Sequence, residues 1–197
     1  MSLTVATWFH ADEAGSEGQY AQVPGSSSAR RFQAVYLRCL VVCMASARRQ
    51  APSARLVILS NVGVDTFDGR IGHMLRRLVD ELSVEWAAVP YTFNPGLGWS
   101  PAWRNQFYVF DALQYLSADG APDRATVLID SDIVIWRSLE TLTHDCLQDG
   151  FVSYLAGYGR ECRRSRNSPP GPSNNSLVVR GVWSTRCRPG WPAVGGR

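Results

Sequence analysis

The alternation of strand-like and helix-like segments constrains the fold more than any other feature of this sequence. Apolar runs suited to buried strands are separated by segments in which apolar residues recur at helical spacing. The expected strands are 3–9, 55–62, 84–90, 126–129 and 151–158, and the expected helices are 32–49, 71–82, 102–116 and 138–146. This order predicts an α/β domain with a mostly parallel sheet and helices on both faces. Ligands of such sheets bind at the carboxyl ends of the strands.

Two acids, Asp130 and Asp132, interrupt the run TVLIDSDIVIW (126–136), which is otherwise suited to a buried strand. Burying a carboxylate costs free energy unless a positive or hydrogen-bonding group meets it, and two close carboxylates repel each other. Alternation along a strand would place both acids on one face and Ser131 on the other. A divalent cation at the strand end would offset both costs, so the pair predicts a metal site. The alternative is that both acids cap a loop.

Several segments resemble those of the GT-A fold glycosyltransferases. LIDSDIVI is similar to their DxD motif, and WRNQFYVFDALQYL (103–116) is similar to the helix that leads into it. The first strand, the helix after it and VILSN also fit. The resemblance covers roughly residues 3–158 and implies a GT-A-like (Rossmann-like) nucleotide-diphospho-sugar transferase fold. It leaves residues 159–197 as a separate segment.

The resemblance implies a metal-dependent glycosyltransferase that moves a sugar from a nucleotide-diphosphate donor to an unknown acceptor. Mn²⁺ or Mg²⁺ would neutralise the diphosphate leaving group, and such cations prefer oxygen ligands. By analogy, Asp132 is the direct metal ligand and Asp130 contacts the metal or the nucleotide ribose. No catalytic residue is assigned. A sugar-nucleotide-binding domain without catalytic activity is the alternative function.

Further donor-binding residues follow from the same resemblance, at the end of the first strand and after the second. The implied nucleotide-sugar-binding set is Thr7, Trp8, Phe9, Asn61, Asp65, Arg104, Asp130 and Ser131, with Ser60 beside Asn61. Arg104 shares a helical stripe with Tyr108, Asp111 and Tyr115. It either reaches a nucleotide phosphate or a motif carboxylate, or belongs to a solvated face. His10 is expected to be a loop residue and not a ligand.

A haloacid-dehalogenase-type phosphatase is a weaker alternative. DSDIVI matches the start of its motif, but that motif belongs on the first strand and the family needs a lysine. All twenty basic residues of this chain are arginine. The missing lysine and the absence of a glycine-rich loop after the first strand also argue against a sugar-nucleotide pyrophosphorylase.

Composition excludes several other classes. A net charge of +3 is too small to indicate nucleic-acid binding, and no apolar run approaches the ~20 residues of a transmembrane segment. The N-terminus lacks the pattern of a signal peptide, so a cytoplasmic location is expected. Five cysteines without C-x-x-C predict neither a disulfide framework nor a structural zinc site.

The last segment, 159–197, has no periodicity and is rich in Arg, Gly, Pro and Ser. It is expected to be irregular: either an aberrant terminus that replaces an acceptor-binding half, or a disordered arginine-rich tail for an anionic partner. The first interpretation predicts weak donor binding and poor sugar transfer.

Overall fold

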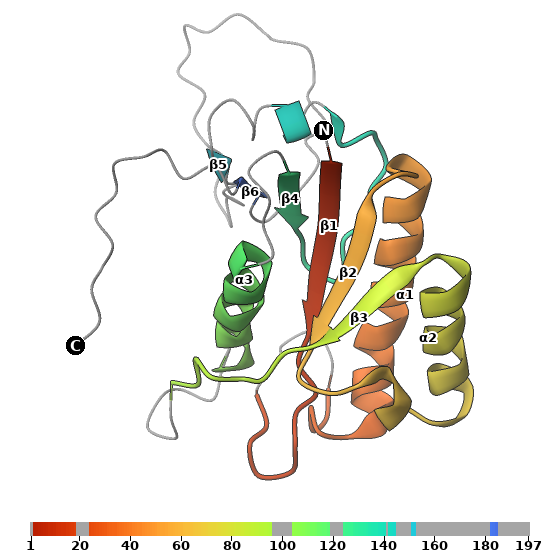
Figure 1. The fold of residues 1–197 in the computed structure, drawn as a ribbon. Coiled ribbons are helices and arrows are strands. Elements are labelled where there is room, and N and C mark those ends of the chain that lie inside the picture. The colour runs from red at the N-terminus through yellow and green to blue at the C-terminus, as the bar shows by residue number, and fades with distance from the viewer. Residues whose placement is uncertain are drawn as a thin grey trace, which may run out of the picture.

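Four neighbouring strands of the sheet are parallel, in the order β3-β2-β1-β4, with β3 at one edge (Figure 1). The computed structural model describes residues 2–18, 24–95, 104–118, 124–140, 142–144, 151–152 and 182–184. The parallel strands are β1 (Ser2–Phe9), β2 (Arg55–Ser60), β3 (Val84–Ala88) and β4 (Arg124–Leu128). Two short strands continue the sheet beyond β4 in antiparallel pairing, β6 (Val182–Ser184) and then β5 (Phe151–Val152). The predicted α/β class and parallel strands are confirmed.

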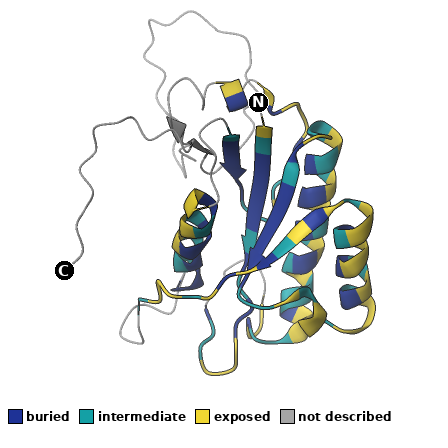
Figure 2. Ribbon diagram, viewed as in Figure 1, coloured by how far each residue is buried: buried dark blue, intermediate teal, exposed yellow. Residues whose placement is uncertain are grey.

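Helices cover both faces of the sheet, as predicted. Helices α1 (Arg30–Gln50) and α2 (Gly69–Glu81) lie on one face, and α3 (Tyr108–Ala118) lies on the other (Figure 1). Side-chain alternation along the strands divides the core accordingly. In β1, Val5 belongs to the α1 core and Ala6 to the α3 core, and in β4, Val127 and Leu128 divide in the same way. The central strands are therefore buried on both faces (Figure 2).

The α3 helix presents a different face to the sheet from the one its apolar residues predict. The 3₁₀ turn η2 (Arg104–Phe107) precedes α3, and η1 (Val64–Thr66) precedes α2. Arg104, Tyr108 and Asp111 are only 7%, 0% and 3% exposed, whereas Phe110 is 47% exposed. The solvated-face interpretation of the Arg104 stripe is therefore wrong. The stripe is buried because it is hydrogen-bonded to the segment that follows β3. The Tyr108 hydroxyl donates to the Val89 carbonyl, and the Asp111 carboxylate accepts from the Thr92 amide.

The acidic segment forms a turn and not a continued strand. β4 ends at Leu128, and the Ile133 amide donates to the Asp130 carbonyl at 3.3 Å. The chain then returns along α1, where the Ile135 amide donates to the Ser46 hydroxyl at 2.9 Å. Asp130 and Asp132 lie in this turn and not on a strand, so the prediction that strand alternation places them on one face is wrong.

The remaining predicted elements are described in part. Residues 140 and 142–144 are helical, within the helix expected over 138–146, and β5 is the start of the strand expected over 151–158. β6 lies within the segment expected to be irregular, and the rest of 159–197 falls outside the described residues. No helix in the described ranges combines the length and apolar character needed to cross a membrane.

Candidate functional site

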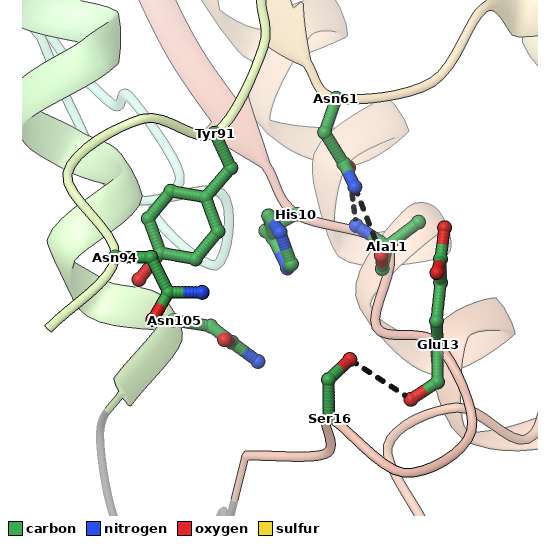
Figure 3. Close-up of a pocket in the computed structure, with 8 residues that line it drawn as sticks. All are labelled: His10, Ala11, Glu13, Ser16, Asn61, Tyr91, Asn94 and Asn105. Atoms are coloured by element: carbon green, nitrogen blue, oxygen red, sulfur yellow. Dashed lines mark hydrogen bonds between the residues drawn. The ribbon is translucent and has the colours of Figure 1, made fainter. Parts of the chain in front are cut away.

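A polar cavity of about 200 Å³ lies at the carboxyl ends of β1, β2 and β3 (Figure 3). Its walls come from the loops after these three strands and from η2. The lining residues are His10, Ala11, Glu13, Ser16, Asn61, Tyr91, Asn94 and Asn105. The chain moves from β1 to β2 and β3 on one side and to β4 on the other, so the strand order reverses beside β1. Ligands of open α/β sheets bind at such a reversal.

The Asp12 carboxylate organises the wall of the cavity. It accepts hydrogen bonds from the Gly18 amide at 2.8 Å, from the Ser27 hydroxyl and from the Asn105 side-chain amide. A fourth contact, at 2.9 Å, joins it to His10 Nδ1. The Asp12 side chain is only 1% exposed, and four polar partners compensate for its burial. Asp12 thus connects the loop after β1 to the start of α1 and to η2.

His10 lines the cavity with a ring held by aromatic neighbours. Its side chain is 8% exposed, and its ring lies beside that of Tyr91 (Figure 3), with the centroids 4.7 Å apart. The centroid of the Tyr108 ring lies 5.3 Å away. Together with the bond from Nδ1 to Asp12, these contacts fix the orientation of the imidazole. His10 lies in the loop after β1, as expected, and its ring forms part of the cavity wall.

The opposite wall depends on Tyr91. Its hydroxyl donates to the Arg104 carbonyl at 2.7 Å. Burial, and then the charge of Asp111, raise the pKa of Tyr91 to about 12, so this phenol stays protonated at neutral pH. Asp111 also accepts from the amides of Thr92 at 3.0 Å and Phe93 at 3.2 Å. The buried stripe of α3 therefore holds the loop that carries Tyr91.

Two of the predicted donor-binding residues lie at the cavity. Asn61 lines it and holds the loop after β1, because its amide oxygen accepts from the Ala11 amide at 2.7 Å and its nitrogen donates to the Ala11 carbonyl at 3.0 Å. Arg104 is buried beside it and contributes the carbonyl that binds Tyr91.

The other predicted residues at the ends of β1 and β2 lie in the core or on the surface. The Thr7 hydroxyl donates to the Ile129 carbonyl at 2.9 Å and ties β1 to the segment that carries Asp130. Trp8 packs on Tyr108, and Phe9 is buried against Phe67. Ser60 is buried, and Asp65 is exposed in η1.

The acidic pair follows β4 on the α1 side of the sheet and does not line the cavity. Asp130 and Ser131 are half-buried and Asp132 is exposed. The Cys43 thiol of α1 donates to the Asp130 carbonyl at 3.8 Å. Burial, and then the charges of Asp132 and Asp130, raise the pKa of Cys43 to about 12. Both acids thus lie near Cys43, and neither lines the cavity.

The acidic pair suits a cation that is also bound by phosphate. Among the described residues, no group of three or more His, Cys, Asp or Glu side chains could hold a metal ion. Mg²⁺ and Mn²⁺ commonly take one or two carboxylates and complete their coordination with water and substrate phosphate. Asp130 and Asp132 provide two carboxylates of this kind. The donor set fits a nucleotide-bound cation better than a cation held by protein alone.

Of the residues that line the cavity, only Asn61 was predicted to bind a ligand; His10, Tyr91 and Asn105, and Asp12 that contacts two of them, were not. The spacing His-x-Asp directly after a buried strand was an available indication, because the carboxyl end of a parallel strand is where ligands bind. Nothing in the local sequence marks Tyr91 or Asn105, because their roles depend on partners elsewhere in the chain.

Comparison with known proteins does not place the chain in a family. The chain matches no model of a known protein family, and a search of curated proteins gives no significant match. The β3-β2-β1-β4 order occurs in doubly wound folds, which carry many unrelated functions. Function therefore has to be argued from the site.

Proposed function

We propose that this chain binds a nucleotide-diphospho-sugar at the carboxyl ends of its parallel strands and acts as a metal-dependent glycosyltransferase. The observation that carries the proposal is the polar cavity after β1, β2 and β3, with two adjacent acids after the neighbouring strand β4. Both features lie at the edge where open α/β sheets bind their ligands. The resemblance of LIDSDIVI to DxD adds the reaction class.

The cavity and the acids would bind different parts of the donor. Among the described residues, no arginine lines the cavity, and Glu13 is its charged carboxylate. A diphosphate is disfavoured there, so the cavity suits the uncharged nucleoside. Asp130 and Asp132 would hold Mn²⁺ or Mg²⁺ against the diphosphate. When bound, this cation would neutralise charge on the leaving group.

A titration of the purified chain with uridine and guanosine diphosphates tests the proposal. We expect binding in the presence of Mn²⁺ and much weaker binding in its absence, measured by calorimetry. Equal affinity with and without Mn²⁺, or no binding of either diphosphate, contradicts it. Adenosine diphosphate is a suitable control, because a site that neutralises any diphosphate would bind all three alike.

A binding domain without catalytic activity is the second candidate, and nucleotide binding alone does not separate it from the enzyme. Release of the nucleoside diphosphate from sugar nucleotides does. Turnover of a donor in the presence of Mn²⁺ favours the transferase, whereas metal-dependent binding without any turnover favours the binding domain. Hydrolysis of a generic phosphate monoester would instead favour the phosphatase alternative.

A further inference from the structure

We propose that His10 binds the cavity ligand as a hydrogen-bond acceptor, through an Nε2 atom that Asp12 keeps unprotonated. The proposal rests on the proposed function in one respect: it takes the ligand to be the nucleoside part of the donor. It assigns His10 the recognition of a hydroxyl or N–H group of that nucleoside. Asp12 is then a positioning residue, which acts through His10.

The hydrogen bonds around Asp12 determine which way the His10 contact runs. The Gly18 amide and the Asn105 side-chain nitrogen can only donate, and both donate to the Asp12 carboxylate. The Ser27 hydroxyl donates to it as well. The Gly18 and Asn105 N–H groups donate to the two different oxygens of the carboxylate, so the remaining contact, at 2.9 Å, is assigned as donated by His10 Nδ1.

A proton on Nδ1 leaves Nε2 of the neutral ring with a lone pair. Within the described parts of the chain, Nε2 makes no hydrogen bond, and the ring lines the cavity (Figure 3). The contacts with Tyr91 and Tyr108 restrict the ring from turning. The result is an acceptor of fixed direction on the cavity wall, within reach of a ligand.

Other groups on the cavity wall strengthen this preference for donors. The oxygen and the nitrogen of the Asn61 side-chain amide are both hydrogen-bonded to the backbone of Ala11, and the Tyr91 hydroxyl donates its proton to the Arg104 carbonyl. Asn105 uses a side-chain N–H on Asp12, and Glu13 offers a carboxylate. A ligand that brings hydroxyl or N–H groups therefore fits better than one that brings only acceptors, such as phosphate.

This arrangement makes ligand binding depend on pH. A ring protonated on both nitrogens donates from both, so a proton on Nε2 and a ligand bound through Nε2 exclude each other. The acceptor is then lost, so affinity falls as the pH falls. The charged or titratable groups near His10 are Asp12, Glu13, Tyr91 and Tyr108, with Arg104 and Asp111 behind Tyr91. Burial raises the pKa of both tyrosines, so both stay protonated as the pH falls.

The first test is the tautomer itself. Long-range proton–nitrogen correlation spectra of the intact chain at about pH 8 distinguish a ring protonated at Nδ1 from one protonated at Nε2. We expect His10 to carry its proton on Nδ1, with the His10→Gln variant used to assign the signal. A His10 ring protonated at Nε2 overturns the proposal, whatever the ligand is.

The second test uses uridine and guanosine without metal, so that it is independent of Asp130 and Asp132. We expect at least one nucleoside to bind the wild-type chain at about pH 8, and its affinity to fall about tenfold once the nitrogen spectra show that His10 is protonated on both nitrogens, which corresponds to one lost hydrogen bond. In His10→Gln, whose amide does not titrate, affinity should be independent of pH. The Glu13→Gln variant is the control: it removes the neighbouring carboxylate but keeps His10, so it should keep the pH dependence of the wild type.

Three results would overturn the proposal: affinity independent of pH in the wild type, equal pH dependence in His10→Gln, or no nucleoside binding at all. Metal-dependent diphosphate binding without nucleoside binding refutes this inference and leaves the proposed function standing. Nucleoside binding without any metal-dependent diphosphate binding does the reverse. Asp12→Asn should retain the fold by circular dichroism and lose affinity at pH 8, because an amide can donate to Nδ1 and move the proton to Nε2.

Discussion

The Asn105 side-chain amide donates a hydrogen bond to the Asp12 carboxylate, and this contact joins segments 93 residues apart in the sequence. It connects the loop after β1 to η2, so that the two walls of the cavity hold each other in place. Both residues are buried, at 5% for Asp12 and 2% for Asn105. The contact therefore belongs to the fold as much as to the site.

Replacing Asn105 by alanine should destabilise the protein and loosen the cavity. The change leaves Asp12 buried with one donor fewer, which costs about 1–3 kcal/mol in the free energy of unfolding. Gln106→Ala is the matched control, because this neighbouring amide is only half-buried and should cost less than about 0.5 kcal/mol. Urea denaturation measures both variants. Equal stability of the two would mean that the Asp12 contact contributes nothing.

Arg48 offers a second test, at the opposite end of the sheet. Its guanidinium donates to the carbonyls of Leu82 at 2.9 and 3.0 Å, Pro52 at 2.7 Å and Ala54 at 2.8 Å. These bonds connect the end of α1 to the loops before β2 and β3. We expect Arg48→Ala to lower the free energy of unfolding by about 1 kcal/mol, because several partly buried carbonyls lose a charged donor.

The neighbouring Arg49 is exposed and provides the control for this experiment. Arg49→Ala removes the same charge from the same turn of α1 and should change stability by less than about 0.5 kcal/mol. If the two alanine variants unfold at the same urea concentration, the hydrogen bonds from Arg48 to these carbonyls make no net contribution to the free energy of unfolding.

The sequence predicted the parallel strands because each is a short apolar run followed by residues that end it. The buried face of α3 could not be predicted in the same way. Helical periodicity shows two stripes, and it does not show that Asp111 is buried because the amides of Thr92 and Phe93 donate to it from another segment. Most of the cavity wall could not be predicted for the same reason. His10 and Asp12 are loop residues, and their contacts are not visible in the local sequence because the partners of Asp12, Ser27 and Asn105, are distant along the chain.

Alkaline stability gives a third prediction. Burial raises the pKa of Tyr91 to about 12, and it raises the pKa of Tyr108 further. In the unfolded chain a tyrosine ionises near pH 10. The stabilisation from these neutral phenols is therefore complete below about pH 10 and is lost as the pH rises toward 12 and beyond.

Urea denaturation between pH 8 and 12 checks this dependence, and absorbance of the phenolate follows ionisation in the native state. We expect the free energy of unfolding to fall above about pH 10, and to fall less steeply in Tyr91→Phe. This variant loses the bond to the Arg104 carbonyl, so it starts from lower stability at pH 8. A native protein whose tyrosines all ionise near pH 10 would contradict the burial of Tyr91 and Tyr108.

The last prediction concerns the metal. Asp132→Ala should abolish the Mn²⁺ dependence of nucleoside diphosphate binding and leave the fold intact, because Asp132 is exposed and its removal relieves repulsion with Asp130. Glu140→Ala is the control, since it removes an exposed acid eight positions later and should leave Mn²⁺-dependent binding unchanged. The Cys43 thiol gives an independent readout: Asp132 contributes to its raised pKa, so the variant should lower that pKa modestly. Unchanged Mn²⁺-dependent affinity in Asp132→Ala would show that Asp132 is not a metal ligand, even if the nucleoside binds in the cavity beside His10.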